Sequence, residues 1–219
     1  MKSFFKLVMR LLRGLFLIIL CICVVQIYDE MFRIWSNTHV SQHSEVTSVI
    51  PSRDFSTLEE KLNTFPSDKP RAAIYFLMQA SEERMKKLLK GLSALYDFYL
   101  KDFDYPIIIF HEEDFGPQYR ERVKRHIPSS IYFQQVEFHI PEFITGYVPK
   151  IACARDVGYR HMCRFNAKLV CEQPIVQNLE YLWRLDDDSL ILKPITYDVF
   201  RYMKAKHYKY GYNKIMGEN

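Results

Sequence analysis

The chain has 219 residues, of which 48% are hydrophobic and 26% are charged, and its formal net charge is +4. This length fits one domain with appendages, and the hydrophobic content excludes an intrinsically disordered chain. The small positive charge gives no reason to expect a nucleic-acid partner, because nucleic-acid-binding domains carry a stronger basic surface.

The N-terminal segment has the pattern of a membrane anchor. Four basic residues precede an apolar run from Leu15 to Val25, and no acidic residue interrupts them. With its flanking residues, the run over residues 14–28 can cross a thin bilayer. The basic flank places residues 1–13 in the cytosol and the rest of the chain in the lumen, as a single-pass type II membrane protein. A cleaved signal peptide is the alternative, but no small-x-small cleavage site follows Val25.

Residues 29–69 have the composition of a stem or linker. They are rich in Ser, Thr, His and Pro and show little periodicity, although a short helix fits Ser56–Asn63. The character changes at Arg71, so a folded domain is expected over residues 70–219.

Beyond Pro70, short apolar runs alternate with amphipathic stretches. The expected strands are Ala72–Met78, a run after Pro106, Ile131–Phe138 and Glu180–Leu185; the expected helices begin at Ser81, lie near Gln118–His126 and cover Gly158–Val170. This alternation is typical of an α/β domain with a largely parallel sheet. In such sheets, ligands bind beyond the carboxyl ends of the strands.

Three consecutive aspartates follow the last expected strand. Along an extended chain, Asp186 and Asp188 project to the same side, while Asp187 points away. Two carboxylates at the mouth of a parallel sheet can hold Mn²⁺ or Mg²⁺, and such ions share their coordination with substrate phosphates. The alternative is a polar turn in which Asp188 only caps or hydrogen-bonds the backbone.

Other polar clusters are weaker metal candidates. His111–Asp114 is more typical of an exposed loop after a strand than of a metal site. Cys153, Cys163 and Cys171 would lie in the lumen, where disulfides persist, so at most one pair forms among them. No cysteine spacing typical of a zinc site occurs.

The segments "YRHMCRFN" (residues 159–166) and "YLWRLDDDS" (residues 181–189) resemble motifs of glycosyltransferase family 15, the fungal-type α-1,2-mannosyltransferases. "RAAIYFLM" and "FDYPIIIFHEEDF" are similar to that family's opening strands, in the same order. The resemblance implies a GT-A type domain in the Golgi or ER lumen, with Mn²⁺ (or Mg²⁺) as the cofactor. It also implies a retaining transfer of mannose from GDP-mannose to an α-mannoside of N- or O-linked glycans.

The resemblance also implies roles for individual residues. Tyr159 matches a nucleotide-site residue, and Arg184 would face the diphosphate. Asp186 stands where the family usually has Glu, and Asp188 matches the second acid of the metal motif. Gln79–Ala80 replaces the family's usual Arg-Asn, so a GT-A transferase that uses another nucleotide sugar is an open alternative.

The family's acceptor half has no counterpart before Asn219. By resemblance, that half carries a histidine metal ligand, a carboxylate near the anomeric carbon and most of the acceptor groove, so the catalytic residues are unknown. The chain is then expected to be either a fragment of an active transferase or a short form that acts as a non-catalytic, membrane-anchored partner subunit.

Overall fold

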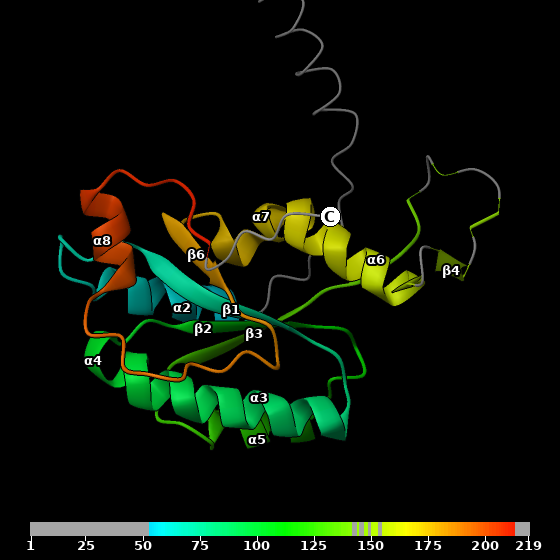
Figure 1. The fold of residues 1–219 in the computed structure, drawn as a ribbon, viewed down its shortest axis with the longest axis horizontal. Coiled ribbons are helices and arrows are strands. Elements are labelled where there is room, and N and C mark those ends of the chain that lie inside the picture. The colour runs from blue at the N-terminus through cyan, green and yellow to red at the C-terminus, as the bar shows by residue number, and fades with distance from the viewer. Residues whose placement is uncertain (1–52, 142–143, 145–146, 149, 153–154, 213–219) are drawn as a thin grey trace, which may run out of the picture. The chain divides into compact units, whose positions relative to one another are not determined.

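The computed structural model describes residues 53–141, 144, 147–148, 150–152 and 155–212 (Figure 1). The predicted cytosolic tail, the anchor at residues 14–28 and most of the predicted linker lie outside these residues and stay predictions. Within the described part of the chain, no helix is both long enough and apolar enough to span a bilayer.

A four-stranded parallel sheet forms the centre of the domain (Figure 1). Its strands, in spatial order, are β3 (Ile131–Gln135), β2 (Ile107–His111), β1 (Ala72–Met78) and β6 (Tyr181–Arg184). The two central strands are buried along almost their whole length, which explains why their sequences are apolar without alternation. The predicted α/β class with a parallel sheet is confirmed, and β3 ends three residues before the expected Phe138.

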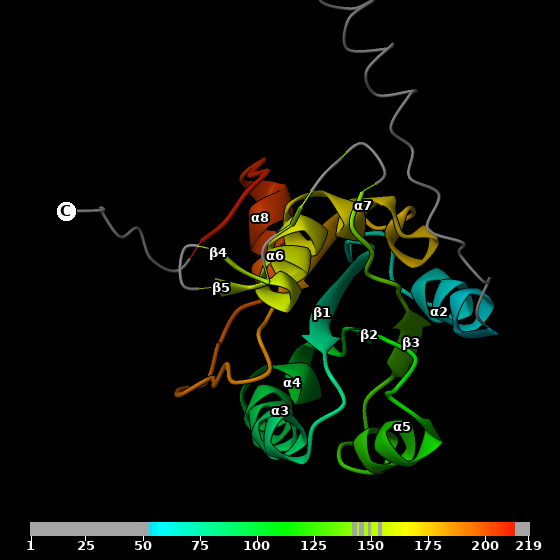
Figure 2. The same ribbon diagram turned by 90° about the vertical axis from the view of Figure 1, so that its right-hand side faces the viewer.

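Helices cover both faces of the sheet (Figure 2). The helices are α3 (Glu82–Leu95) and α5 (Pro117–Lys124) on one face, and α2 (Arg53–Asn63) and α6 (Val157–Arg164) with its continuation on the other. Side chains of β1 alternate between the two faces: Ile74 and Phe76 pack in the α3 layer, whereas Ala73 and Tyr75 pack in the opposite layer. The face that each strand residue occupies therefore follows from its position in the strand.

The first long helical segment begins where the sequence predicts, after Ser81, and the second runs from Val157 to Glu172, one residue earlier and two residues later than the expected Gly158–Val170. Ser81 caps α3 by accepting a hydrogen bond from the Arg84 backbone N–H at 3.5 Å. The continuations are η1 (Tyr96–Leu100) and α4 (Lys101–Phe103) after α3, and η2 (Phe165–Leu169) and α7 (Val170–Glu172) after α6. Pro174 begins a separate 3₁₀ turn, η3 (Pro174–Val176), so it does end the second segment.

Helix α2 belongs to the folded domain, although the sequence placed it in the linker. Leu58 and Leu62 are 0% and 2% exposed and lie in the core layer on the face of the sheet opposite α3. The Asp54 carboxylate accepts a hydrogen bond from the Phe133 backbone N–H at 2.8 Å, which ties the helix to β3. The described fold therefore includes Arg53–Asn63, ahead of the boundary expected at residue 70, because the apolar face of this short helix needs the sheet as its partner.

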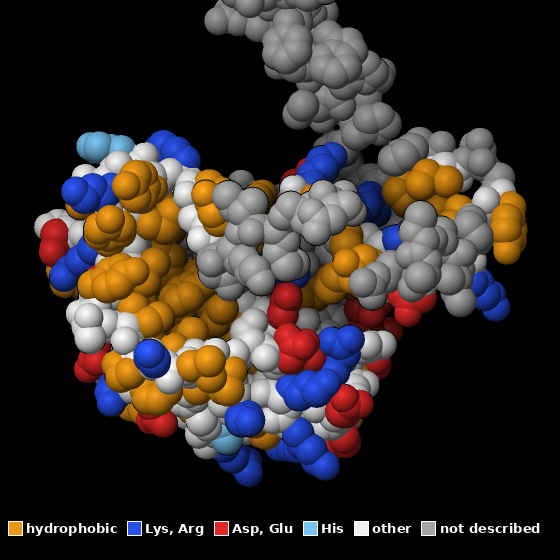
Figure 3. Space-filling model, in the orientation of Figure 1, with side chains coloured by type: hydrophobic (Ala, Val, Ile, Leu, Met, Phe, Trp, Pro, Cys, Tyr) orange, Lys and Arg blue, Asp and Glu red, His pale blue; other side chains and the backbone are white. Residues whose placement is uncertain are grey.

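Three further elements were not expected from the sequence. A short antiparallel pair, β4 (Ile151–Ala152) and β5 (Arg155–Asp156), precedes α6, and α8 (Val199–Ala205) follows the last strand. The Asp198 carboxylate caps α8 by accepting from the backbone N–H groups of Phe200 and Arg201. Hydrophobic side chains gather on the surface over α8 and β6 (Figure 3).

The strand order reverses between β1 and β6. From β1 the chain moves outward to β2 and then β3, and it later returns to the opposite side of β1 as β6. Ligands of open α/β sheets bind beyond the strand ends at such a reversal. The carboxyl ends of β1 and β6 are thus the place to look for a site.

Candidate functional site

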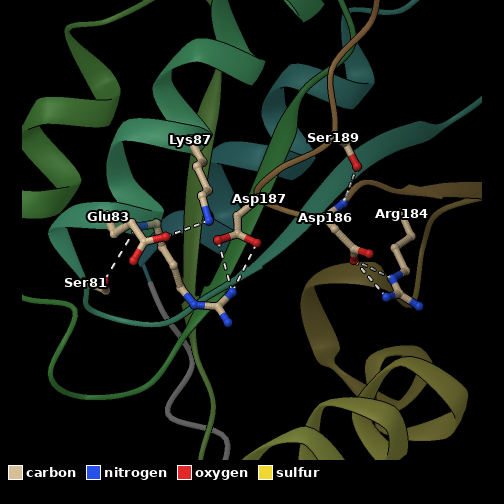
Figure 4. A network of polar contacts seen from close by, with 8 residues as sticks. Ser81, Glu83, Lys87, Arg184, Asp186, Asp187 and Ser189 are labelled. Carbon is tan, nitrogen blue, oxygen red and sulfur yellow. Dashed lines mark hydrogen bonds and ion pairs between the residues drawn. The ribbon is translucent and has the colours of Figure 1, made fainter.

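The three aspartates lie in a tight turn directly after β6. Figure 4 shows Asp186, Asp187 and Ser189 of this turn. The Ser189 backbone N–H donates to the Asp186 carbonyl oxygen at 2.9 Å, and the Asp186 N–H donates to Ser189 Oγ at 3.0 Å. We call residues 186–189 the acid turn. The segment is therefore not the extended strand assumed from the sequence, and Ser189, not Asp188, closes the turn.

The three carboxylates occupy three different environments. Asp187 is 8% exposed, and Arg84 Nη1 donates to both of its oxygens at 3.1 Å. Asp186 is exposed, and Arg184 donates to its Oδ1 from Nε at 3.0 Å and from Nη2 at 2.8 Å. Asp188 is exposed, and no hydrogen bond or ion pair joins it to another described residue. Asp186 and Asp187 point in different directions, as the sequence suggested (Figure 4).

Positive side chains explain how three adjacent carboxylates can coexist. Besides Arg84 and Arg184, Lys87 of α3 lies near the turn (Figure 4). Its pKa is raised mainly by a hydrogen bond and ion pair with Glu83 at 2.8 Å, and further by the charges of Asp187 and Asp188. Acidic and basic side chains accordingly lie next to one another in the middle of this face (Figure 3).

The segment "YRHMCRFN" forms most of α6 and the start of η2. Tyr159 lies in the first turn of α6 with an exposed side chain, and its backbone N–H donates to Asp156 Oδ1 at 2.7 Å. At the other end of the segment, the Asn166 side chain accepts a hydrogen bond from the Tyr75 hydroxyl at 3.1 Å. The segment is thus tied to β1 by its last residue.

Tyr75 links this segment to the acid turn and was missed by the sequence reasoning. It is paired in register with Arg184 across β1 and β6, and its carbonyl accepts from the Leu185 N–H at 3.0 Å. Burial raises the pKa of Tyr75 to about 12, with Arg184 opposing the shift and Asp186 adding to it. The only signal in the sequence is a hydroxyl within an otherwise apolar strand.

The weaker metal candidates remain without support. His111 is buried, and its Nδ1 lies 2.7 Å from the Glu112 carbonyl oxygen; burial lowers its pKa. Cys163 and Cys171 are free, exposed thiols, while Cys153 lies outside the described residues. Across the described ranges, no group of three or more His, Cys, Asp or Glu side chains is arranged to hold a metal ion.

The acid turn nevertheless has oxygens available for a cation. Both Arg184 donors contact Asp186 Oδ1, so Asp186 Oδ2 accepts no hydrogen bond from a described residue. The Asp188 carboxylate is similarly available. Two exposed carboxylate oxygens fit a hard divalent ion whose other ligands are phosphate oxygens and water.

A family model described as "Glycolipid 2-alpha-mannosyltransferase" matches residues 33–218. The chain belongs to this family. The match confirms the resemblance that the motifs of α6 and the acid turn indicated.

Curated relatives come from yeasts. The chain is 26% identical over 157 residues to O-glycoside alpha-1,2-mannosyltransferase homolog 5 of Schizosaccharomyces pombe, covering 67% of this chain and 37% of the relative. It is 27% identical over 186 residues to O-glycoside alpha-1,2-mannosyltransferase omh1 of the same species, covering 75% and 47%. The chain therefore spans less than half the length of these relatives.

Two solved structures share the fold. Core-mannan synthase A (CmsA/Ktr4) from Aspergillus fumigatus, in its Mn/GDP form, matches with a TM-score of 0.57 and 24% identity, over 66% of this chain and 42% of that chain. The mannosyltransferase Ktr4p from Saccharomyces cerevisiae, in complex with GDP, matches with a TM-score of 0.56 and 19% identity, over 74% and 50%. At these identities the likeness shows the fold alone.

Proposed function

We propose that this chain carries the donor-binding half of a GT-A mannosyltransferase, which transfers mannose from GDP-mannose with retention of configuration and with the help of Mn²⁺ or Mg²⁺. One observation carries the proposal. In a member of this family, the acid turn presents two available carboxylates beside the point where the strand order of the sheet reverses.

Each site residue has a chemical role in this proposal. Asp186 Oδ2 and Asp188 hold the cation, Arg184 meets the diphosphate, and Tyr159 contacts the nucleotide. The cation supplies positive charge against the charge that develops on the departing GDP. Arg184 must turn from Asp186 Oδ1 to the phosphates, and a planar guanidinium with several N–H donors suits both partners.

The acceptor belongs to the same proposal. It is an α-mannoside of N- or O-linked glycans, reached in the lumen of the Golgi or the ER by a type II protein anchored through residues 14–28. The acceptor groove and the groups that act at the anomeric carbon are assigned to a part of the relatives that this chain does not match, since it covers 37% and 47% of two of them.

Binding of GDP to the full chain in detergent, with and without MnCl₂, tests the proposal. The wild-type chain is expected to bind GDP only with Mn²⁺, and Asp188→Ala is expected to weaken binding at least about tenfold, because even outer partners of a metal ligand are worth that much. Asp102→Ala is the matched control, since Asp102 is an exposed aspartate on α4.

The other functions predict different results. GDP binding that is independent of Mn²⁺ and unchanged in Asp188→Ala would contradict the transferase site. Binding of a protein partner that is likewise unaffected would favour the membrane-anchored partner subunit. Displacement of GDP by a UDP-sugar more readily than by GDP-mannose would assign the site to another nucleotide sugar.

A further inference from the structure

The middle aspartate of the acid turn is the one that the protein itself binds. Asp187 accepts hydrogen bonds from Arg84 at both carboxylate oxygens, and its side chain is 10% exposed against 48% for Arg84. Burial and this ion pair leave the Asp187 carboxylate less available to a second cation than the exposed carboxylates of Asp186 and Asp188. Asp187 is therefore set apart from Asp186 and Asp188.

A second contact joins the same turn to the same helix. A Cβ atom placed on Gly91 of α3 would lie 2.8 Å from the Ser189 backbone carbonyl oxygen, closer than real Cβ contacts allow. Glycine thus permits the helix backbone to lie directly against the turn. Arg84 and Gly91 are seven residues apart, so the two contacts are spread over about 10 Å of the helix.

The shape of the turn and its place on α3 depend on different contacts. The two hydrogen bonds between Asp186 and Ser189 fix its shape, whereas the contacts with Arg84 and Gly91 fix its place on α3. Carboxylates that share a cation must be held within about 0.5 Å of their working positions. The Leu185 N–H, which donates to the Tyr75 carbonyl oxygen at 3.0 Å, ties the start of the turn to β1, and the contacts with Arg84 and Gly91 hold the rest of it against α3.

We propose that Asp187 is a positioning residue: with Arg84 it clamps the acid turn onto α3, so that Asp186 and Asp188 are presented to the cation and the nucleotide. The inference rests on the proposed function for what the clamp serves, but the clamp itself is a property of the ligand-free chain. Asp187 thus has a structural role, in a motif whose three carboxylates could otherwise all compete for the metal ion.

Amide hydrogen exchange on the full chain in detergent tests the clamp without any ligand. In Arg84→Met and Asp187→Asn, the peptide covering residues 184–192 is expected to exchange about tenfold faster than in the wild type, since a hydrogen bond to a charged group is lost. Arg84→Lys is expected to stay close to the wild type, because one nitrogen makes both contacts. Arg122→Met is the matched control: Arg122 pairs with Glu82 in the first turn of α3 at 2.7 Å and forms no hydrogen bond or ion pair with the acid turn.

Two exchange results would overturn the clamp. One is an unchanged exchange rate over residues 184–192 in both Arg84→Met and Asp187→Asn. The other is an equal acceleration in Arg122→Met, which would show that any damage to α3 loosens the turn. If Arg84→Met does not fold, Asp187→Asn and Arg84→Lys still decide between these results.

GDP binding in the presence of MnCl₂ tests what the clamp is for. Arg84→Met and Asp187→Asn are expected to bind GDP about five- to tenfold more weakly, with Arg84→Lys restoring most of the affinity and Arg122→Met unchanged. Faster exchange with unchanged affinity would overturn the positioning role. A wild-type chain that binds no GDP would contradict the proposed function alone, and the exchange experiment would still decide the clamp.

Discussion

The acid turn has two sides that differ in how they treat the same kind of residue. On the α3 side, Asp187 is buried, paired with Arg84, and packed where Gly91 meets Ser189. On the side of Arg184, which we call the α6 side, the Asp186 carboxylate is exposed and Arg184 is its only side-chain partner among the described residues. Asp188 is also exposed, and no described residue forms a hydrogen bond or ion pair with its carboxylate. Three identical side chains in a row have thus been divided by their surroundings into one that holds the structure and two that are available to a ligand.

This division follows from the sheet. Asp187 turns toward the layer that covers one face of the sheet, and Arg184 lies on the opposite face with its register partner Tyr75. Successive strand side chains point to opposite faces, and the turn preserves that separation although it is not extended. If the comparison is right, changes on the α3 side should lower stability, and changes on the α6 side should alter ligand binding.

The largest effect is expected from Gly91→Leu on the α3 side. Its Cβ would meet the Ser189 carbonyl oxygen at 2.8 Å, and backbone cannot rotate out of the way as a side chain can. We expect a loss of about 2–3 kcal/mol in the free energy of unfolding, in the range of overpacking substitutions, measured by urea unfolding of the full chain in detergent. Lys90→Leu, at an exposed position on the same helix, should stay within about 0.5 kcal/mol. Equal stability of the two variants would mean that α3 and the turn are not in close contact.

Tyr75→Phe tests the link between the two layers. Loss of the hydroxyl that donates to Asn166 should cost about 1 kcal/mol at neutral pH. The folded-state pKa of Tyr75 is raised to about 12, above its unfolded value near 10, so its contribution is fully present below pH 10 and is lost as the pH rises toward 12. The wild type should therefore lose its advantage and become the less stable protein above about pH 11.

The exposed Tyr202 provides the control for that measurement. Tyr202→Phe removes a hydroxyl from a surface side chain of α8 and should leave the pH dependence of urea unfolding unchanged. A constant difference between wild type and Tyr75→Phe from pH 8 to pH 12 would show that the Tyr75 hydroxyl is not held in a buried environment.

Much of the fold could be predicted from local patterns. The strand Ala72–Met78 has the expected bounds, and Ser81 caps the helix that follows, because an apolar run and a capping residue act over a few neighbouring positions. Helix α2 was assigned to the linker because residues 29–69 are polar and show little periodicity, and only the sheet reveals what Leu58 and Leu62 pack against. The role of Tyr75 was hidden for the same reason, since its partner Asn166 is 91 positions away in the chain.

The sequence indicated where the candidate site lies, but not which of its three carboxylates the protein itself binds. Asp186 and Asp188 were singled out by an alternation that assumes an extended chain, and the chain there is a turn closed by Ser189. The structure sets Asp187 apart by burial against Arg84, which comes from another element and leaves no mark near the aspartates. Contacts between elements that are distant in the sequence decide which carboxylate is available to a ligand, and residue spacing along one strand gives no information about such contacts.

The smallest effect, and the one that most sharpens the comparison, is expected from Arg184→Met on the α6 side. Arg184 occupies Asp186 Oδ1 in the ligand-free chain, so its removal should strengthen binding of Mn²⁺ alone by up to about fivefold, the worth of an exposed ion pair. The same change should weaken binding of GDP in the presence of Mn²⁺ by a similar factor, because the diphosphate loses its guanidinium partner. Titration of Mn²⁺ alone, followed by GDP at saturating Mn²⁺, measures both.

Arg201→Met is the matched control. Arg201 is an arginine of α8 with a side chain about as exposed as that of Arg184, and it pairs with Asp68 at 3.0 Å. Both affinities should be unchanged in that variant. Opposite signs in Arg184→Met would show that one arginine serves Asp186 before the nucleotide arrives and the phosphates afterwards. Changes of the same sign would instead mean that Arg184 only shapes the turn, and the α6 side would then resemble the α3 side in being built for structure.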